Sequence, residues 1–194
     1  MPRQVTKKND VVDAALALFM KQGIKGTTTR DIALRAGASE GTIYRHFDSK
    51  DELARIVFEQ NLDFFWRFLR NYLKETQGVE EVLGAFVEGF FEFARRYQIK
   101  YSFLFAAHQT ELRKLSRRKM KPLRMLARII RLGQKQGHFR EIDPDLAAAM
   151  LVGTISQTIF YLKSGLIAVG YEDVISETKN ACLNILRREK VIQS

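Results

Sequence analysis

Cysteine and proline are scarce in this chain of 194 residues. Cys182 is the single cysteine, so no disulfide can form within one chain, as expected in a reducing compartment. Of the three prolines, none lies between Pro2 and Pro122, which favours long helices. The sequence also lacks a glycine-rich phosphate loop and paired cysteines. Their absence removes the usual signatures of nucleotide-dependent enzymes and small zinc modules.

No targeting segment is expected from the sequence. The first ten residues, MPRQVTKKND, contain no apolar segment of signal-peptide length. No apolar run is expected to approach the roughly 18 residues of a membrane-spanning helix. With 46% hydrophobic and 28% charged residues, the composition is that of a soluble globular protein. We therefore expect a cytoplasmic protein with no membrane partner.

Acidic residues are outnumbered, with 22 Asp/Glu against 32 Lys/Arg and a formal net charge of +10. This balance favours an acidic partner such as nucleic acid. Residues 1–50 hold nine Lys/Arg and five Asp/Glu, whereas residues 112–140 hold eleven Lys/Arg and no acidic residue. The basic excess is therefore split between two regions that need separate explanations.

Helical periodicity runs along the chain, and no segment shows the alternation of a strand. Local stop and cap signals predict an all-α fold of about nine helices. Gly23 is a plausible end of the first helix, and Thr28 with Asp31 forms a capping box for the second. Ser39 caps a short helix over residues 40–47. Further helices are predicted over residues 53–75, 79–97, about 101–112, 113–136, 145–163 and 172–188.

The segments 28–36 and 40–47, joined by Gly37-Ala38-Ser39, have the proportions of a helix-turn-helix. Gly37 can adopt the left-handed conformation that the tight turn requires. Ile43 and Phe47 are four residues apart and should face inward, so the other side of the short helix can enter a DNA major groove. The spacing alone leaves one alternative open, an ordinary helical hairpin with a solvated polar face.

Residues 10 to 53, DVVDAALALFMKQGIKGTTTRDIALRAGASEGTIYRHFDSKDEL, resemble the N-terminal domain of TetR-family transcriptional regulators. The later segment GHFREIDPDLAAAMLVG more weakly resembles the family's C-terminal half. The resemblance implies a DNA-binding domain over residues 1–50 and a helical ligand-binding and dimerisation domain over 51–194. It also implies a homodimer that binds a double-stranded DNA operator and is released from it by a small molecule, with repression as the commoner outcome.

The resemblance also implies which residues contact DNA: Thr28, Arg30, Thr42, Tyr44, Arg45, His46 and Lys50. Their chemistry suits the role, because arginine can bind guanine through two hydrogen bonds and a threonine methyl can touch that of thymine. Tyr44, His46 and Lys50 can donate to phosphate. Glu40 departs from the family pattern, in which many members carry a basic residue. No phosphate contact is assigned to this carboxylate, and a cytosine amino group is its alternative partner.

Aromatic residues are concentrated in residues 58–105, which hold ten of the fourteen phenylalanines. Core packing accounts for most of them. Their crowding also suggests an apolar ligand pocket with a few polar groups. The candidate ligand-binding residues are Phe64, Phe68, Phe86, Phe90, Phe105, His108, Gln157 and Tyr161.

Basic residues recur every three or four positions from Arg113 to Lys135, which forms one helical stripe. A solvated face is the simplest interpretation, although like charges at this spacing destabilise a helix. A phosphate-bearing ligand would relieve the repulsion, with Arg117, Arg124 and Arg128 as candidate anion contacts. Some members of the family respond to acyl-CoA. An amphiphilic, acyl-CoA-like or fatty-acid-like effector is therefore one hypothesis, and a neutral or cationic hydrophobic effector is the alternative.

Two functions from other classes stay open, a non-specific DNA-coating protein and a helical enzyme. His108 and Glu111 share a helical face, but two residues are too few for a metal site. No catalytic residue, metal site or cofactor is assigned. Dimerisation is expected through helices 145–163 and 172–188, whose small residues permit close helix approach. These residues are Ala147, Ala148, Ala149, Gly153, Ala181 and Cys182.

Overall fold

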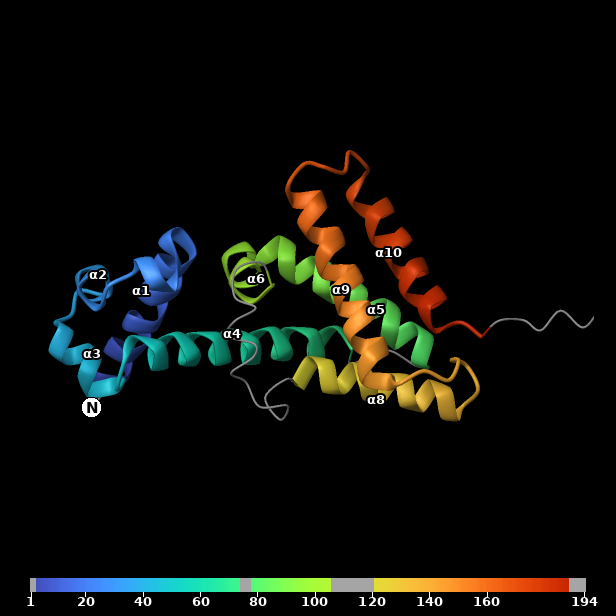
Figure 1. Ribbon diagram of the computed structural model, residues 1–194, viewed down its shortest axis with the longest axis horizontal. Helices are drawn as coiled ribbons and strands as arrows, with labels where there is room; N and C mark the ends of the chain where they lie inside the picture. The colour runs from blue at the N-terminus through green and yellow to red at the C-terminus, as the bar shows by residue number, and fades with distance from the viewer. Residues whose placement is uncertain (1–2, 74–77, 106–120, 189–194) are drawn as a thin grey trace, which may run out of the picture. The chain divides into compact units, whose positions relative to one another are not determined.

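The computed structural model describes residues 3–73, 78–105 and 121–188, in which the regular structure is helical apart from one isolated β-bridge between Phe139 and Arg187. This confirms the predicted all-α fold. Nine helices lie in these ranges (Figure 1): α1 (Arg3–Gly26), α2 (Thr29–Arg35), α3 (Glu40–His46), α4 (Lys50–Tyr72), α5 (Val79–Arg96), α6 (Gln98–Phe105), α8 (Lys121–Lys135), α9 (Pro144–Lys163) and α10 (Tyr171–Leu186).

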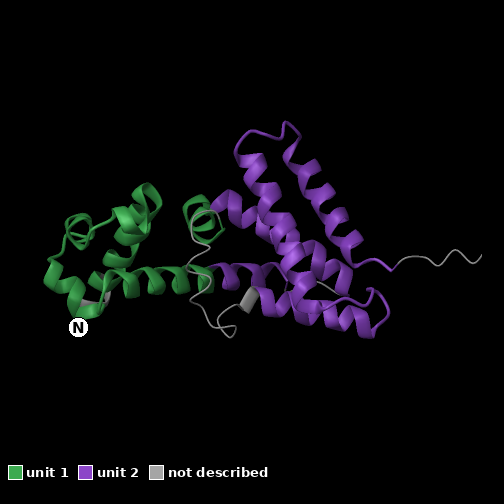
Figure 2. Cartoon of the chain, in the orientation of Figure 1, with its two compact units in different colours: residues 1–64, 97–119 green, residues 65–96, 120–194 purple. Residues whose placement is uncertain are grey.

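The chain divides into two compact units (Figure 2). Unit 1 comprises residues 1–64 and 97–119, and unit 2 comprises residues 65–96 and 120–194. Helix α4 therefore begins in unit 1 and ends in unit 2. The domain boundary expected after residue 50 falls at the first residue of α4.

Unit 1 is organised by caps and glycines close to their predicted places. Gly23, with a φ of 74°, interrupts the helical geometry of α1, and Gly37, with a φ of 57°, makes the turn after α2. Thr28 Oγ1 accepts from Asp31 N at 3.1 Å, and an Asp31 carboxylate oxygen accepts from Thr28 N at 3.1 Å, which completes the capping box. Ser39 Oγ accepts from Thr42 N at 3.2 Å and caps α3. Short helices start here because their first amides have side-chain acceptors.

Aromatic rings fill the core of unit 2. The ring centroid of Phe65 lies 4.9 Å from that of Phe90 and 4.7 Å from that of Phe93. Phe86 lies 5.8 Å from Phe90, and both are fully buried. Gly89 of α5 allows the close approach of α4, since a Cβ there would lie 3.0 Å from Leu69 Cδ2. The phenylalanine crowding in the sequence thus includes a densely packed core.

The segment after α8 closes against the end of α10. Arg140 N donates to Leu186 O at 2.9 Å, and Arg140 Nε donates to Ile185 O at 2.8 Å. Arg188 Nε donates to Phe139 O at 3.3 Å. These bonds hold the buried Phe139 ring against Gly133 of α8, where a side chain would have no space.

Helix α9 corrects one expectation from the sequence. By length and composition it could cross a membrane, the one such helix in the described residues, so the statement that no apolar run approaches that length was wrong. Residues 146–162 include no charged residue. The polar residues among them are threonine, serine and glutamine, which are neutral. Its inward face packs in unit 2 through Ala147, Ala148, Leu151, Ile155 and Ile159.

The other face of α9 is exposed and largely apolar. Leu146 is 55% exposed and Phe160 48%, and Met150 and Tyr161 are also exposed. The small residues expected at a subunit interface divide between the two faces. Ala149, Gly153 and Ala181 are exposed. A correction applies to Ala147, Ala148 and Cys182, which are fully buried inside the chain because they lie on inward-facing helix positions.

Candidate nucleic-acid interface

The turn between α2 and α3 is fixed by neighbouring helices of unit 1. Ile43 and Phe47 are both buried, as predicted from their spacing. Lys7 of α1 donates from Nζ to Gly37 O at 3.0 Å and to Ala36 O at 3.3 Å. The ammonium thus satisfies carbonyls at the C-terminal end of α2, where the helix dipole favours a cation. The sequence carried no local signal for this contact, because Lys7 lies 30 positions from Gly37.

The outward face of α3 carries most of the residues expected to contact bases. Tyr44 is 55% exposed, and Arg45 is exposed beside it. Thr42 and His46 are partly exposed at the flanks, and Thr42 Oγ1 lies 3.0 Å from Ser39 Oγ. The short helix therefore presents a row of polar side chains opposite the buried Ile43, the arrangement of a recognition helix.

Glu40 lies on the same exposed face and is held by α2. Thr29 Oγ1 donates to Glu40 Oε2 at 2.7 Å, and the same hydroxyl lies 3.5 Å from Tyr44 Oη. The sequence marked Glu40 as unusual but gave no sign of Thr29, because the two residues are eleven positions apart.

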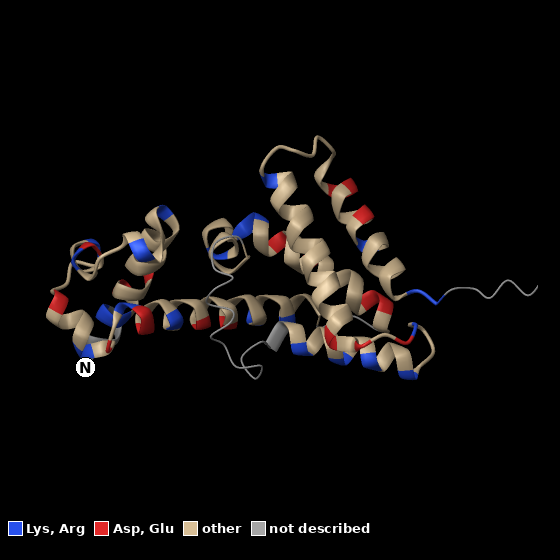
Figure 3. Ribbon diagram, viewed as in Figure 1, with Lys and Arg blue, Asp and Glu red and all other residues tan. Residues whose placement is uncertain are grey.

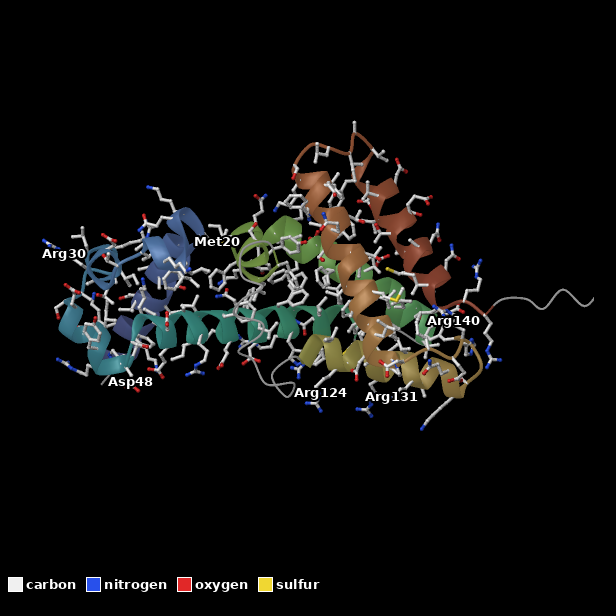
Figure 4. The ribbon with its side chains drawn as sticks, in the orientation of Figure 1. Met20, Arg30, Asp48, Arg124, Arg131 and Arg140 are labelled. Carbon is white, nitrogen blue, oxygen red and sulfur yellow. The ribbon has the colours of Figure 1, made fainter. Side chains whose placement is uncertain are left out.

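The remaining predicted DNA contacts flank α3. Arg30 is exposed on α2, where Figure 4 labels it. Thr28 is exposed and donates from Oγ1 to Asp31 Oδ2 at 2.7 Å, which with its backbone bond holds the pKa of the Asp31 carboxyl below its ordinary value. Lys50 Nζ donates to Thr27 O at 2.7 Å, a partner that sequence reasoning missed. An ammonium has three donors, so this bond still leaves Lys50 capacity for a phosphate.

The candidate ligand residues are distributed over both units. Phe64 and Phe105 belong to unit 1, where their rings lie 4.9 Å from Tyr97 and 5.1 Å from Tyr101 respectively. Unit 2 contains Phe68, Phe86, Phe90, Gln157 and Tyr161, of which Gln157 and Tyr161 lie on the exposed part of α9. His108 lies outside the described residues, as do Glu111, Arg113 and Arg117.

The described part of the basic stripe forms one face of α8 (Figure 3). Arg124, Arg128, Arg131 and Lys135 are exposed, whereas Leu126, Ala127 and Ile130 are buried on the opposite side. Figure 4 shows Arg124 and Arg131 projecting from the same side of the helix. Arg131 Nη2 lies 4.0 Å from Asp145 Oδ2, the acidic partner that α8 itself lacks. The described residues of the stripe thus form a single exposed face, as their periodicity predicted.

The described residues of unit 2 also line open hollows that the sequence did not reveal. One, of about 920 Å³, is lined by Arg140, Glu141, Met150, Asn184, Ile185, Arg187 and Arg188. A second, of about 540 Å³, is lined by Tyr72, Glu88, Glu92, Arg95, Tyr171, Glu172 and Ile175. Both combine residues that are far apart in the chain, so no sequence motif marks them.

Two of the glutamates that line the second hollow form ion pairs with basic residues. Arg95 donates to both carboxylate oxygens of Glu92, at 2.6 and 2.7 Å, and its bonding holds the pKa of Glu92 below its ordinary value. Lys179 Nζ donates to Glu88 Oε1 at 2.6 Å. Tyr171 Oη donates to Phe91 O at 3.0 Å, and burial raises the pKa of its phenol. Across the described part of the chain, no group of three or more His, Cys, Asp or Glu residues could hold a metal ion.

The comparisons with known proteins agree with this architecture. Residues 11–57 match the family described as bacterial regulatory proteins, tetR family. The repressor KstR2 of Mycolicibacterium smegmatis is 27% identical over 172 residues, which cover 82% of this chain and 81% of the relative. The fatty acid metabolism regulator protein of Bacillus subtilis is 26% identical over 164 residues, which cover 82% of this chain and 84% of the relative.

Solved structures share the fold over nearly the whole chain. A TetR-family transcription regulator from Shewanella sp. PV-4 matches with a TM-score of 0.83 and 21% identity, over 94% of this chain and 99% of that one. FadR of Bacillus subtilis, in complex with stearoyl-CoA, matches with a TM-score of 0.73 and 23% identity, over 92% of this chain and 96% of that one. The capped helix-turn-helix of unit 1 and the family match over residues 11–57 lead to one conclusion: the chain carries the DNA-binding domain of the TetR family of transcriptional regulators.

Proposed function

We propose that the protein is a homodimeric repressor that binds a near-palindromic operator and leaves it when an amphiphilic, anionic small molecule binds. An acyl-CoA thioester is the leading candidate for this effector. The observation that carries the choice of effector is the exposed arginine face of α8. Arg124 and Arg128 lie on a helix whose described residues include no acidic side chain.

Two further observations support DNA binding as a dimer. The outward face of α3 carries base- and phosphate-binding side chains, and one chain supplies one such helix. The exposed apolar side chains of α9, Leu146, Met150, Phe160 and Tyr161, offer a surface that a second copy can cover. Two recognition helices related by a twofold axis reach half-sites about 34 Å apart.

Relatives support the repressing role and the effector class. The relative from Mycolicibacterium smegmatis is named a repressor, and one from Bacillus subtilis is named a fatty acid metabolism regulator. An acyl-CoA combines phosphates, which arginines bind well, with an apolar chain suited to aromatic surroundings. The rings of Phe65, Phe86 and Phe90 pack against one another, so an acyl chain that entered among these three rings would have to displace core side chains.

Helix α4 is the proposed route of coupling, because it belongs to both units. Effector binding can only weaken DNA binding by as much as the effector prefers the DNA-incompatible state. An effector that binds the DNA-incompatible state tenfold more tightly than the DNA-binding state can shift the equilibrium between them by about 1.4 kcal/mol.

The test begins with selection of genomic fragments by the purified protein, followed by competition of the bound operator with small molecules. We expect release by a long-chain acyl-CoA and weaker release by free CoA or the fatty acid alone. Neutral aromatic compounds and cationic dyes are the comparison set. Release by that set alone would discard the anionic effector.

Two variants connect release to the arginine face. The double substitution Arg124→Gln and Arg128→Gln should weaken acyl-CoA binding by about tenfold or more, since each removes a charge-assisted hydrogen bond. Arg70→Gln is the control for loss of an exposed arginine, because Arg70 is exposed on α4 and lines neither of the two described hollows. If the double variant and the control bind acyl-CoA with equal affinity, the arginine face of α8 is a solvated surface that does not contact the effector.

A second candidate effector class has its own supporting observation. The 540 Å³ hollow of unit 2 is lined by Tyr72, Tyr171, Arg95 and three glutamates, of which Glu92 pairs with Arg95 and Glu88 with Lys179, while Glu172 is exposed. Carboxylates and aromatic faces both attract organic cations. Release by cationic dyes that is lost in Glu172→Gln would favour this class over the acyl-CoA.

A further inference from the structure

Glu40 stands out on the DNA-facing side of α3. Glu40 and Tyr44, one helical turn on, are both exposed on the same side of α3, whereas Ile43 of this helix is buried. A carboxylate in this position is repelled by the phosphates of DNA. Its presence on the face that enters the groove therefore calls for a partner that donates hydrogen bonds.

The orientation of this carboxylate is set by a neighbouring helix. Thr29, in the first turn of α2, donates from Oγ1 to Glu40 Oε2 at 2.7 Å. The Thr29 hydroxyl has one hydrogen, so any bond across the 3.5 Å to Tyr44 Oη is donated by the tyrosine. One lone pair of Oε2 is thereby engaged, and among the described residues no hydrogen bond to Oε1 of Glu40 is formed.

We infer that Glu40 is a specificity-determining residue whose Oε1 accepts a hydrogen bond from the N4 amino group of a cytosine in the major groove. The other bases fit this oxygen poorly. Guanine presents two acceptors and thymine an acceptor beside a methyl group, while adenine places its amino donor next to the N7 acceptor. Cytosine alone offers a donor without an acceptor on the same base edge. The inference rests on the proposed sequence-specific DNA binding.

A purely structural role for Glu40 makes a different prediction. Its bond to Thr29 links α2 to α3, and the loss of that link alone would change stability rather than base preference. Glu40→Gln separates the two roles, because the amide oxygen can still accept from Thr29 while the amide nitrogen replaces Oε1 with a donor. The donor should turn the preference away from cytosine and toward a purine, which presents acceptors.

The experiment is selection from a randomised duplex library by the full-length protein, with affinities then measured for single-base variants of the selected site. For the wild type we expect one position in each half-site at which cytosine is preferred by about fivefold to tenfold. Glu40→Gln should abolish that preference or move it to a purine, and leave the other positions unchanged. Thr29→Val frees the carboxylate, and should reduce the cytosine preference without redirecting it.

Asp13→Asn is the matched control for charge. It removes one exposed carboxylate from α1, so it changes the net charge of unit 1 by the same amount as Glu40→Gln. It should leave every base preference as in the wild type. Thermal unfolding of each variant establishes that it is folded.

Three outcomes overturn the inference in different ways. If Glu40→Gln binds all sequences more tightly and keeps the wild-type preferences, the carboxylate only repels phosphates. If the wild-type protein selects no sequence at all, the proposed regulatory function fails and the inference falls with it. If the wild-type protein selects an operator but Glu40→Gln alters no cytosine preference in it, the inference is wrong and the proposed regulatory function still stands.

Discussion

Replacing Gly133 with alanine should destabilise unit 2, although alanine is the better helix former by about 1 kcal/mol. A Cβ at this position would lie 2.5 Å from Cε2 and 2.9 Å from Cγ of Phe139. Ordinary contacts between carbon atoms are about 3.5–4.0 Å. The phenylalanine ring would therefore have to move by about 1 Å or more.

The surroundings of Phe139 resist this movement. The side chain is only 2% exposed, and its backbone is held on both sides. Phe139 N donates to Gly133 O at 3.2 Å, and Phe139 O accepts from Arg188 Nε at 3.3 Å. Overpacking a core costs about 1–3 kcal/mol, and expelling the ring would forfeit about 2–3 kcal/mol of burial. After subtraction of the gain in helix propensity of about 1 kcal/mol, the expected net loss is about 1–2 kcal/mol, which lowers the melting temperature by about 2–8 °C.

Gly153→Ala is the matched control, because it is the same change in a helix of the same unit. No atom lies within 4 Å of a Cβ at Gly153, so the variant should gain roughly 0.5–1 kcal/mol. Gly153 lies on the exposed face of α9, so melting is measured at several protein concentrations to separate any effect on association.

A double variant tests the cause directly. Phe139→Leu combined with Gly133→Ala should lose less stability than the sum of the two single changes, because the smaller side chain makes room for the Cβ. The reasoning is refuted if Gly133→Ala alone melts at or above the wild-type temperature.

Three further predictions follow from other parts of the structure. The pKa of Asp31 is lowered chiefly by the Thr28 hydroxyl bond, so its stabilisation is present above its unfolded pKa and is lost as pH falls through the folded value. Asp31→Ala should therefore melt below the wild type at pH 7, and the difference should shrink below about pH 4; a gap independent of pH would contradict this. Burial raises the pKa of the Cys182 thiol to about 12, so a disulfide reagent at pH 8 should react with it only after denaturation, and rapid reaction with the native protein would be inconsistent with the core. Met150→Asp places a charge on the exposed face of α9, so light scattering at micromolar concentration should give a monomer for the variant and a dimer for the wild type; a monomeric wild type would end the dimer proposal.

The helix-turn-helix could be predicted from the sequence because its signals are local. The Thr28–Asp31 capping box, the Ser39 cap and the left-handed Gly37 each involve residues within a few positions of one another. Helix periodicity then placed Ile43 and Phe47 in the core. The acidic cap Asp143 and the proline after it similarly marked the start of α9.

Contacts between distant segments had no such signal. The bonds from Lys50 to Thr27 and from Thr29 to Glu40 depend on how α2 packs, which periodicity does not determine. Periodicity identified small residues on α9, but it could not distinguish a neighbouring helix of the same chain from one of a second copy. Ala147 and Ala148 were assigned to the wrong neighbour for this reason.

The division of labour within α3 bears on how such regulators diversify. The fold of the motif depends on the buried Ile43 and the cap at Ser39, whereas Tyr44 and Arg45 are exposed and contribute little to the core. Substitutions at the exposed positions can therefore accumulate after gene duplication with little loss of stability. A duplicate can acquire a new operator while its scaffold stays intact. Glu40 is the exception, because its carboxylate accepts a hydrogen bond from Thr29. A substitution of Glu40 is therefore best tolerated when Thr29 is substituted as well.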